Sequence, residues 1–196
     1  MPPAWSTFTQ RGIDLAASLA PGRVWIPITN PDILNQLRTT GTVTFNITMA
    51  NLPICSELKI RNIYLNLVGA TAGVPSLNGV LTHAGNAQAR RRDGTTLQLS
   101  SPPMTSFAVV GLASGQVPSA PTQAPTAPKD SLPVTTDVLP RRTETTTTTV
   151  GAAGLPAFYG RSPVTTWTFA LADPNPVNLS GLTKIEVGLD FLAVVS

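Results

Sequence analysis

The sequence contains one cysteine and one histidine, which are its best candidates for nucleophilic catalysis. A thiolate activated by an imidazole is a common nucleophile pair, and Cys55 with His83 could form one if the fold brought them together. No nucleophile-elbow pattern flanks either residue. We therefore expect structural roles, a half-buried thiol and an imidazole at a strand end, in a protein that is not an enzyme.

The acidic residues do not form a catalytic pattern. Glu186 and Asp190 share one face of a predicted strand and lie about 13 Å apart. This exceeds the usual carboxylate spacing of a glycosidase, and we expect both side chains on the solvent face. A structural zinc site needs about four nitrogen or sulfur ligands, and glycine-rich phosphate loops are absent from the sequence. The sequence predicts no catalytic residue, no metal and no cofactor.

Three consecutive arginines, Arg90, Arg91 and Arg92, account for the net charge of +3. They could bind phosphates, and Arg141 with Arg142 would enlarge the patch if that segment folded beside it. No aromatic side chain alternates with them to stack on bases. An exposed hairpin tip is therefore favoured over a nucleic-acid site, and the three arginines remain candidate contact residues.

A short helix near residues 31–39 is the best-marked local element. Asn30 can cap it, Pro31 suits its first turn, and Gly41 supplies a left-handed residue at its end. After Gly41 the apolar period changes from helical to two, which predicts a strand with Val43 and Phe45 on one side.

Two further patterns predict details of the sheet. In residues 56–69, Leu58 and Ile60 have one parity and Ile63 has the other, which indicates a β-bulge near Arg61 and Asn62 or a strand buried on both faces. Residues 86–99 predict a hairpin with a three-residue tip at 92–94 and Gly94 at positive φ. That register pairs Ala89 with Leu97 and Ala87 with Leu99.

Two later segments also alternate as strands. Residues 104–112 predict a mostly buried strand, and residues 184–195 predict a long terminal strand inside the sheet.

Composition and length favour one domain over residues 1–196. Charged residues are 12% and hydrophobic residues 42%, and threonine, proline and glycine are abundant. We expect an all-β, antiparallel, jelly-roll-like β-sandwich with one short helix, interrupted by a Pro/Thr-rich loop or linker at about 114–154. A stretch of this loop, Thr143–Val150, is β-prone and could join a sheet edge, although an extended surface segment is favoured. Its candidate contact residues are Thr145, Thr146, Thr147, Thr148 and Thr149.

Neither a secretory signal nor a membrane span is visible in the sequence. The first residues lack a basic region followed by an apolar core, and no apolar run approaches the ~18 residues of a spanning helix. Location stays open, with export independent of a signal peptide among the alternatives.

Three segments resemble a known family. They are "NPDILNQLRTTGTVTFNI", "LKIRNIYLNLVGA" and the ending "NLSGLTKIEVGLDFLA". Together they are similar to the C-terminal β-rich, B-component-binding region of the A component of bacterial Tc insecticidal toxins, over about two thirds of the chain. The resemblance implies a β-rich domain that docks a second toxin component and helps assemble a translocation complex.

These observations favour a non-enzymatic module that acts by binding a protein partner or by self-association, through a sheet edge or the Thr-rich segment. One alternative is a viral-capsid-like jelly roll, although residues 1–22 contain a single Arg and no Lys, and so lack a basic genome-binding arm. A second alternative is a carbohydrate-binding module with Trp5, Trp25 or Trp167 as the sugar platform, although Trp25 and Trp167 fall in strands where core positions are more common.

Overall fold

The computed structural model describes residues 19–74, 77–118, 157–175 and 177–194. Apart from the helix α2 (Pro31–Thr40) and a short 3-10 helix, η1 (Met49–Asn51), the regular elements of this part are strands. In chain order the strands are β1 (Leu19–Ile28), β2 (Thr42–Asn46), β3 (Ser56–Val68), β4 (Thr71–Ala72), β5 (Leu77–Arg90), β6 (Thr96–Leu99), β7 (Met104–Gly111), β8 (Val164–Leu171), β9 (Val177–Asn178) and β10 (Lys184–Val194). The predicted all-β fold with one short α-helix is confirmed.

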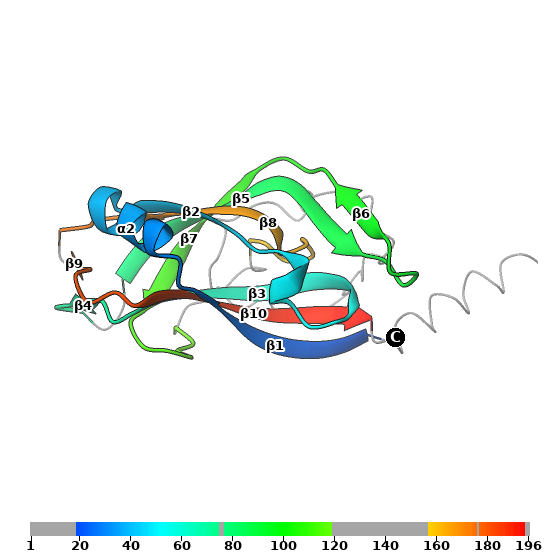
Figure 1. Cartoon of the computed structure of the whole chain (residues 1–196), viewed down its shortest axis with the longest axis horizontal. Coiled ribbons are helices and arrows are strands. Elements are labelled where there is room, and N and C mark those ends of the chain that lie inside the picture. The colour runs from blue at the N-terminus through cyan, green and yellow to red at the C-terminus, as the bar shows by residue number, and fades with distance from the viewer. Residues whose placement is uncertain (1–18, 75–76, 119–156, 176, 195–196) are drawn as a thin grey trace, which may run out of the picture.

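The main sheet has the strand order β1-β10-β3-β7-β5-β8-β2, and β6 pairs with the C-terminal end of β5. It curls into two layers, β1-β10-β3 and β7-β5-β8-β2, which Figure 1 shows facing each other. The layers are joined where β3 and β7 pair in parallel at Leu65 with Val110 and Asn66 with Gly111. The two layers confirm the sandwich-like form. The other strand pairs are antiparallel, so the sheet is mixed rather than purely antiparallel as predicted.

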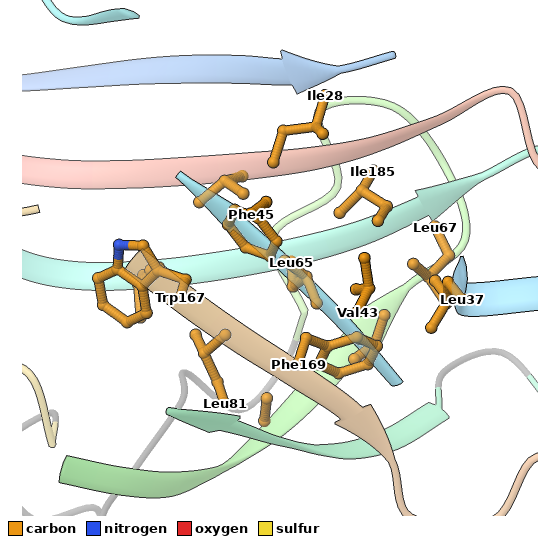
Figure 2. Packing of buried hydrophobic residues seen from close by; sticks show 14 of the residues in the cluster. Ile28, Leu37, Val43, Phe45, Leu65, Leu67, Leu81, Trp167, Phe169 and Ile185 are labelled. Atoms are coloured by element: carbon orange, nitrogen blue, oxygen red, sulfur yellow. The ribbon is translucent and has the colours of Figure 1, made fainter. Parts of the chain in front are cut away.

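The core fills the space between the two layers. Aromatic and branched side chains from both layers interdigitate there, with Trp167 and Phe169 of β8 facing Leu65 and Ile185 (Figure 2). β10 lies between β1 and β3, so the prediction that the terminal strand is internal is confirmed.

A bulge in β3 reconciles its two apolar parities. Asn62 pairs with Asp190 and Ile60 pairs with Phe191, which leaves Arg61 as the extra residue. Leu58, Ile60 and Ile63 are all buried as a result, and most of the strand is buried on both faces. The predicted bulge near Arg61 and the alternative prediction of a strand buried on both faces are therefore both correct.

The predicted hairpin is confirmed in its register. Ala87 pairs with Leu99 and Ala89 pairs with Leu97. Gly94 has φ of 83° and donates its N–H to the carbonyl of Arg91 at 3.0 Å, which closes the three-residue tip.

Helix α2 follows its sequence signals. The Asn30 side chain accepts a hydrogen bond from the Asp32 N–H at 2.9 Å, and Gly41 closes the helix at φ of 69°. The helix also covers the outer edge of β2. The Thr40 hydroxyl donates to the Thr42 carbonyl at 2.8 Å, and the Gln36 side-chain oxygen accepts from the Thr44 N–H at 3.5 Å. These contacts occupy backbone groups that another strand would otherwise pair with.

The expectation of a mostly buried strand at residues 104–112 is wrong in one respect. β7 alternates between buried and outward-facing positions, and Phe107 points outward with 63% of its surface exposed. One face of the layer to which β7 belongs is covered by the core, and its other face is open.

Most of the Pro/Thr-rich segment, including Thr143–Val150 and Arg141 with Arg142, lies outside the described residues. Among the residues that the structure does describe, no helix has the length and hydrophobicity needed to cross a membrane.

Candidate functional site

His83 is a buried residue in the middle of β5, not at a strand end as expected. β5 runs seven residues beyond it, which the sequence pattern did not indicate. Its Nε2 is 3.0 Å from the Ser162 carbonyl, to which it donates, and its Nδ1 accepts from the Gly85 N–H at 3.0 Å. Burial is the main reason that the pKa of His83 falls to about 4. The ring is therefore neutral near pH 7, and both of its nitrogens are occupied by backbone groups.

Cys55 is half-buried, as expected, and burial raises the pKa of its thiol. A raised pKa keeps the sulfur protonated near neutral pH, whereas a nucleophile needs the thiolate. Cys55 lines a small apolar hollow with Leu52, Leu58 and Ala89. These surroundings suit a packing role.

The expectation that Glu186 faces solvent is wrong. Only 4% of its surface is exposed, because the turn that follows β7 folds over the outer side of β10. Its carboxylate accepts hydrogen bonds from Lys184 Nζ at 2.7 Å, Ser114 Oγ at 2.8 Å, the Gly115 N–H at 2.5 Å and Asn66 Nδ2 at 3.4 Å. Burial alone would raise the pKa of Glu186, but these donors outweigh it and lower the pKa to about 2.

Asp190 is also engaged rather than free in solvent. Its two oxygens accept from Arg23 Nε at 2.5 Å and Nη2 at 3.0 Å, and the Tyr64 hydroxyl donates to it at 2.8 Å. Burial opposes ionisation, yet the bonds from Arg23 and Tyr64 keep the pKa of Asp190 lowered. Both carboxylates thus act as acceptors within the fold.

Replacing Glu186 with alanine is expected to cost about 1–3 kcal/mol of unfolding free energy, because buried donors lose their acceptor. Glu186→Gln keeps the shape and one acceptor oxygen, so its loss is expected to be smaller. Urea unfolding at neutral pH measures both. Equal midpoints for wild type and Glu186→Ala would show that the turn at Ser114 and Gly115 does not depend on this carboxylate.

The arginines lie where the sequence placed them, at the tip of the β5–β6 hairpin. Arg91 and Arg92 are exposed and Arg90 is partly buried. Arg92 Nε lies 4.0 Å from a carboxylate oxygen of Glu57. The other candidate contact residues, Thr145 to Thr149, lie outside the described residues.

The tryptophans differ in their suitability as a sugar platform. Trp167 is fully buried, so it cannot stack on an external ring. Trp25 is half-buried and lies over Gly188, with its ring 6.3 Å from that of Tyr64, so the expectation of a core position holds for Trp167 and not for Trp25. Trp5 lies outside the described residues.

Among the described residues, the outward-facing side chains of β7, β5, β8 and β2 form one surface, which we call the threonine face. Its members alternate with core residues along each strand and carry no formal charge. They are Thr105, Phe107, Val109, Asn78, Val80, Thr82, Thr166, Thr168, Ala170, Thr42, Thr44 and Asn46.

Two rows cross the threonine face from strand to strand. One row consists of Thr105, Thr82, Thr168 and Thr44, in which the outer pairs share hydroxyl hydrogen bonds of 2.9 Å and 3.1 Å. The neighbouring row places Val80 between Phe107 and Ala170. The sequence predicted which side chains of β2 point outward, but it did not predict which strands lie beside β2 across the face.

Among the described residues, no strand pairs with the outer edge of β1, and this edge is poorly suited to accept one. Proline has no N–H, so neither Pro21 nor Pro27 of β1 can donate a backbone hydrogen bond to an added strand. They remove two donors from that edge, while α2 covers the edge of β2. Both outer edges of the described sheet are therefore poorly suited to pairing with another strand.

The fold and its outer surface define an all-β, sandwich-like protein with an uncharged sheet face over β7, β5, β8 and β2. No family model matches the chain, and no curated protein matches it. Among solved structures it is similar to the cryo-EM structure of Yersinia pseudotuberculosis TcaA-TcaB, with 12% sequence identity and a TM-score of 0.44. The match covers 90% of this chain and 10% of that chain. A likeness this distant carries no argument about function.

Proposed function

We propose that the chain is a non-enzymatic association module that docks a protein partner or a second copy of itself through the threonine face. The observation that carries the proposal is the breadth of uncharged surface over four adjacent strands, with Phe107 projecting from it. Interface cores are depleted in charged residues and enriched in aromatic ones, because desolvating an unpaired charge is costly. A partner surface must then also be largely uncharged where it meets this face.

The surroundings of the reactive side chains support a non-enzymatic role. His83 is neutral and bonded to backbone at both nitrogens, and the Cys55 thiol is protonated. Glu186 and Asp190 serve as acceptors for structural donors. None of these groups combines the access and the activated state that a nucleophile or general base requires.

The finer proposal is a role in a Tc-toxin-like or other secreted assembly. Its support is the resemblance of the three sequence motifs, whose residues form α2 with β2, β3 and β10 in this fold. A shared motif of this kind concerns architecture first, and the choice of partner depends on the surface.

The test is a charge placed in the middle of the threonine face. Val80→Lys is expected to weaken association at least tenfold, because the new ammonium must be desolvated in the contact. Thr71→Lys is the matched control, since it adds the same charge at an exposed position of β4, which belongs to the separate two-stranded sheet β4-β9. Light scattering over a concentration series measures self-association.

Equal association of Val80→Lys and wild type would exclude this face as the contact. Wild-type protein that stays a monodisperse monomer at high micromolar concentration would reject self-association. The heterologous form would then be tested with the same two variants and a B-component protein of a Tc toxin as the probe.

A further inference from the structure

Arg161 is a buried cation with only neutral partners among the described residues. Its surface is 3% exposed, and its Nη1 donates to Ser101 Oγ at 3.0 Å and to the Pro102 carbonyl at 2.9 Å. The same nitrogen lies 3.4 Å from His83 Nδ1. Burying a guanidinium without a compensating negative charge is costly, and burial lowers the pKa of Arg161.

The backbone around Arg161 holds the side chain in this position. The Gly160 N–H donates to the Ile60 carbonyl and the Ile60 N–H donates to the Arg161 carbonyl, both at 2.9 Å. Residues 160–161 are thereby attached to β3 at Ile60, outside the part of β3 that pairs with β7 at Leu65 and Asn66. Phe158 packs edge-on against Trp167 and stacks near His83, which closes the other side. The guanidinium has little freedom to reach solvent.

A small cavity adjoins this guanidinium. Its lining includes Arg161, Ser100, Ser101, Ala87 and Leu99, and it has room for about one water-sized atom. The hydrogen bonds that Arg161 makes with described residues all leave from Nη1, and its buried Nε has no acceptor there. Nε is covered by protein, whereas Nη2 makes no hydrogen bond with a described residue, so Nη2 is the guanidinium nitrogen left to meet an acceptor in the cavity.

We propose that this cavity binds a monovalent anion of the size of chloride against the guanidinium of Arg161. Such an anion supplies the missing negative charge and accepts from Nη2, which has no acceptor among the described residues. The volume excludes sulfate and phosphate, and a cation would be repelled. Water fits the space but leaves the buried charge uncompensated. The site is independent of the threonine face, so each proposal can fail alone.

The first measurement is thermal unfolding at constant ionic strength, with sodium chloride replaced stepwise by sodium gluconate. An anion that binds only the folded state raises Tm by mass action, and the expected rise in chloride is about 2–4 °C. Constant ionic strength removes general screening from the comparison. Crystals soaked in sodium bromide give the second readout, an anomalous peak beside the Arg161 guanidinium.

Ala87→Val is the decisive variant, because its added methyl groups fill the cavity while Arg161 stays in place. It is expected to lose the chloride dependence of Tm, whatever its absolute stability. Ala89→Val is the matched control on the same strand, since Ala89 is equally buried but lines the hollow beside Cys55. It is expected to keep the wild-type dependence.

Arg161→Met removes the cation and is also expected to abolish the dependence. A wild-type Tm independent of chloride, the lack of a bromide peak, or an unchanged dependence in Ala87→Val would each overturn the proposal and leave a water-filled cavity.

Discussion

Replacing Trp167 with alanine is expected to lower the free energy of unfolding by about 3–5 kcal/mol. The side chain is 0% exposed, and its indole N–H donates to the Pro163 carbonyl at 3.0 Å. Its ring meets His83 and Phe158 edge-on, at centroid distances of 4.9 Å and 5.1 Å. Truncation would remove these contacts and leave a cavity at the centre of the core that the surrounding strands cannot close.

Phe107→Ala is the matched control, an aromatic residue on a strand of the same layer but on the opposite face. Because Phe107 is largely exposed, its loss is expected to change stability by about 0.5 kcal/mol or less. Urea unfolding followed by circular dichroism measures both variants. Similar losses for the two would contradict the assignment of inner and outer faces in the layer that contains β7 and β8.

Acidification from pH 6.5 to pH 4 is expected to remove about 3 kcal/mol of stability through His83 alone. The ordinary pKa of this imidazole is 6.5, and in the folded protein it falls to about 4. Burial is the main cause, nearby Arg161 adds to it, and the hydrogen bond to the Ser162 carbonyl opposes it. Within this window the unfolded chain binds a proton that the native state rejects, so the unfolding equilibrium shifts toward the unfolded state as pH falls.

The carboxylates are separable from this effect by their pH range. The pKa of Glu186 is lowered from 4.5 to about 2, so its stabilisation is present above pH 4.5 and is lost only as pH falls further. Urea midpoints measured between pH 6.5 and 4.5 therefore report mainly on His83. His83→Gln cannot gain a proton and is expected to show a flatter profile there. A variant profile as steep as that of wild type would assign the acid sensitivity to another group.

Local elements of the fold were predictable because their signals are contained in a few neighbouring residues. The cap at Asn30, the left-handed Gly41 and the three-residue hairpin tip at Gly94 each depend on contacts within one turn. The bulge at Arg61 was predictable for a related reason, because side chains alternate with a period of two and a change of parity requires an extra residue.

The environment of the polar side chains was not predictable in this way. Strand alternation places Glu186 on the side of the sheet that points away from the core, but alternation does not specify what covers that side. The turn after β7, more than 70 positions earlier in the chain, covers this residue and supplies two of its donors. His83 and Arg161 likewise meet only because residues 160–161 attach to β3.

The sequence by itself thus determined the class of the fold, the helix, the hairpin and the alternation of β2 and β10, because these follow from local conformational preferences and from periodicity. Tertiary structure decided which polar sides lie next to one another. β7 and β8 flank β5 on opposite sides, and β2 comes from the first quarter of the chain, so the threonine face joins residues that are up to 128 positions apart, from Thr42 to Ala170. Long-range pairing depends on the packing of the whole core, which no single segment encodes.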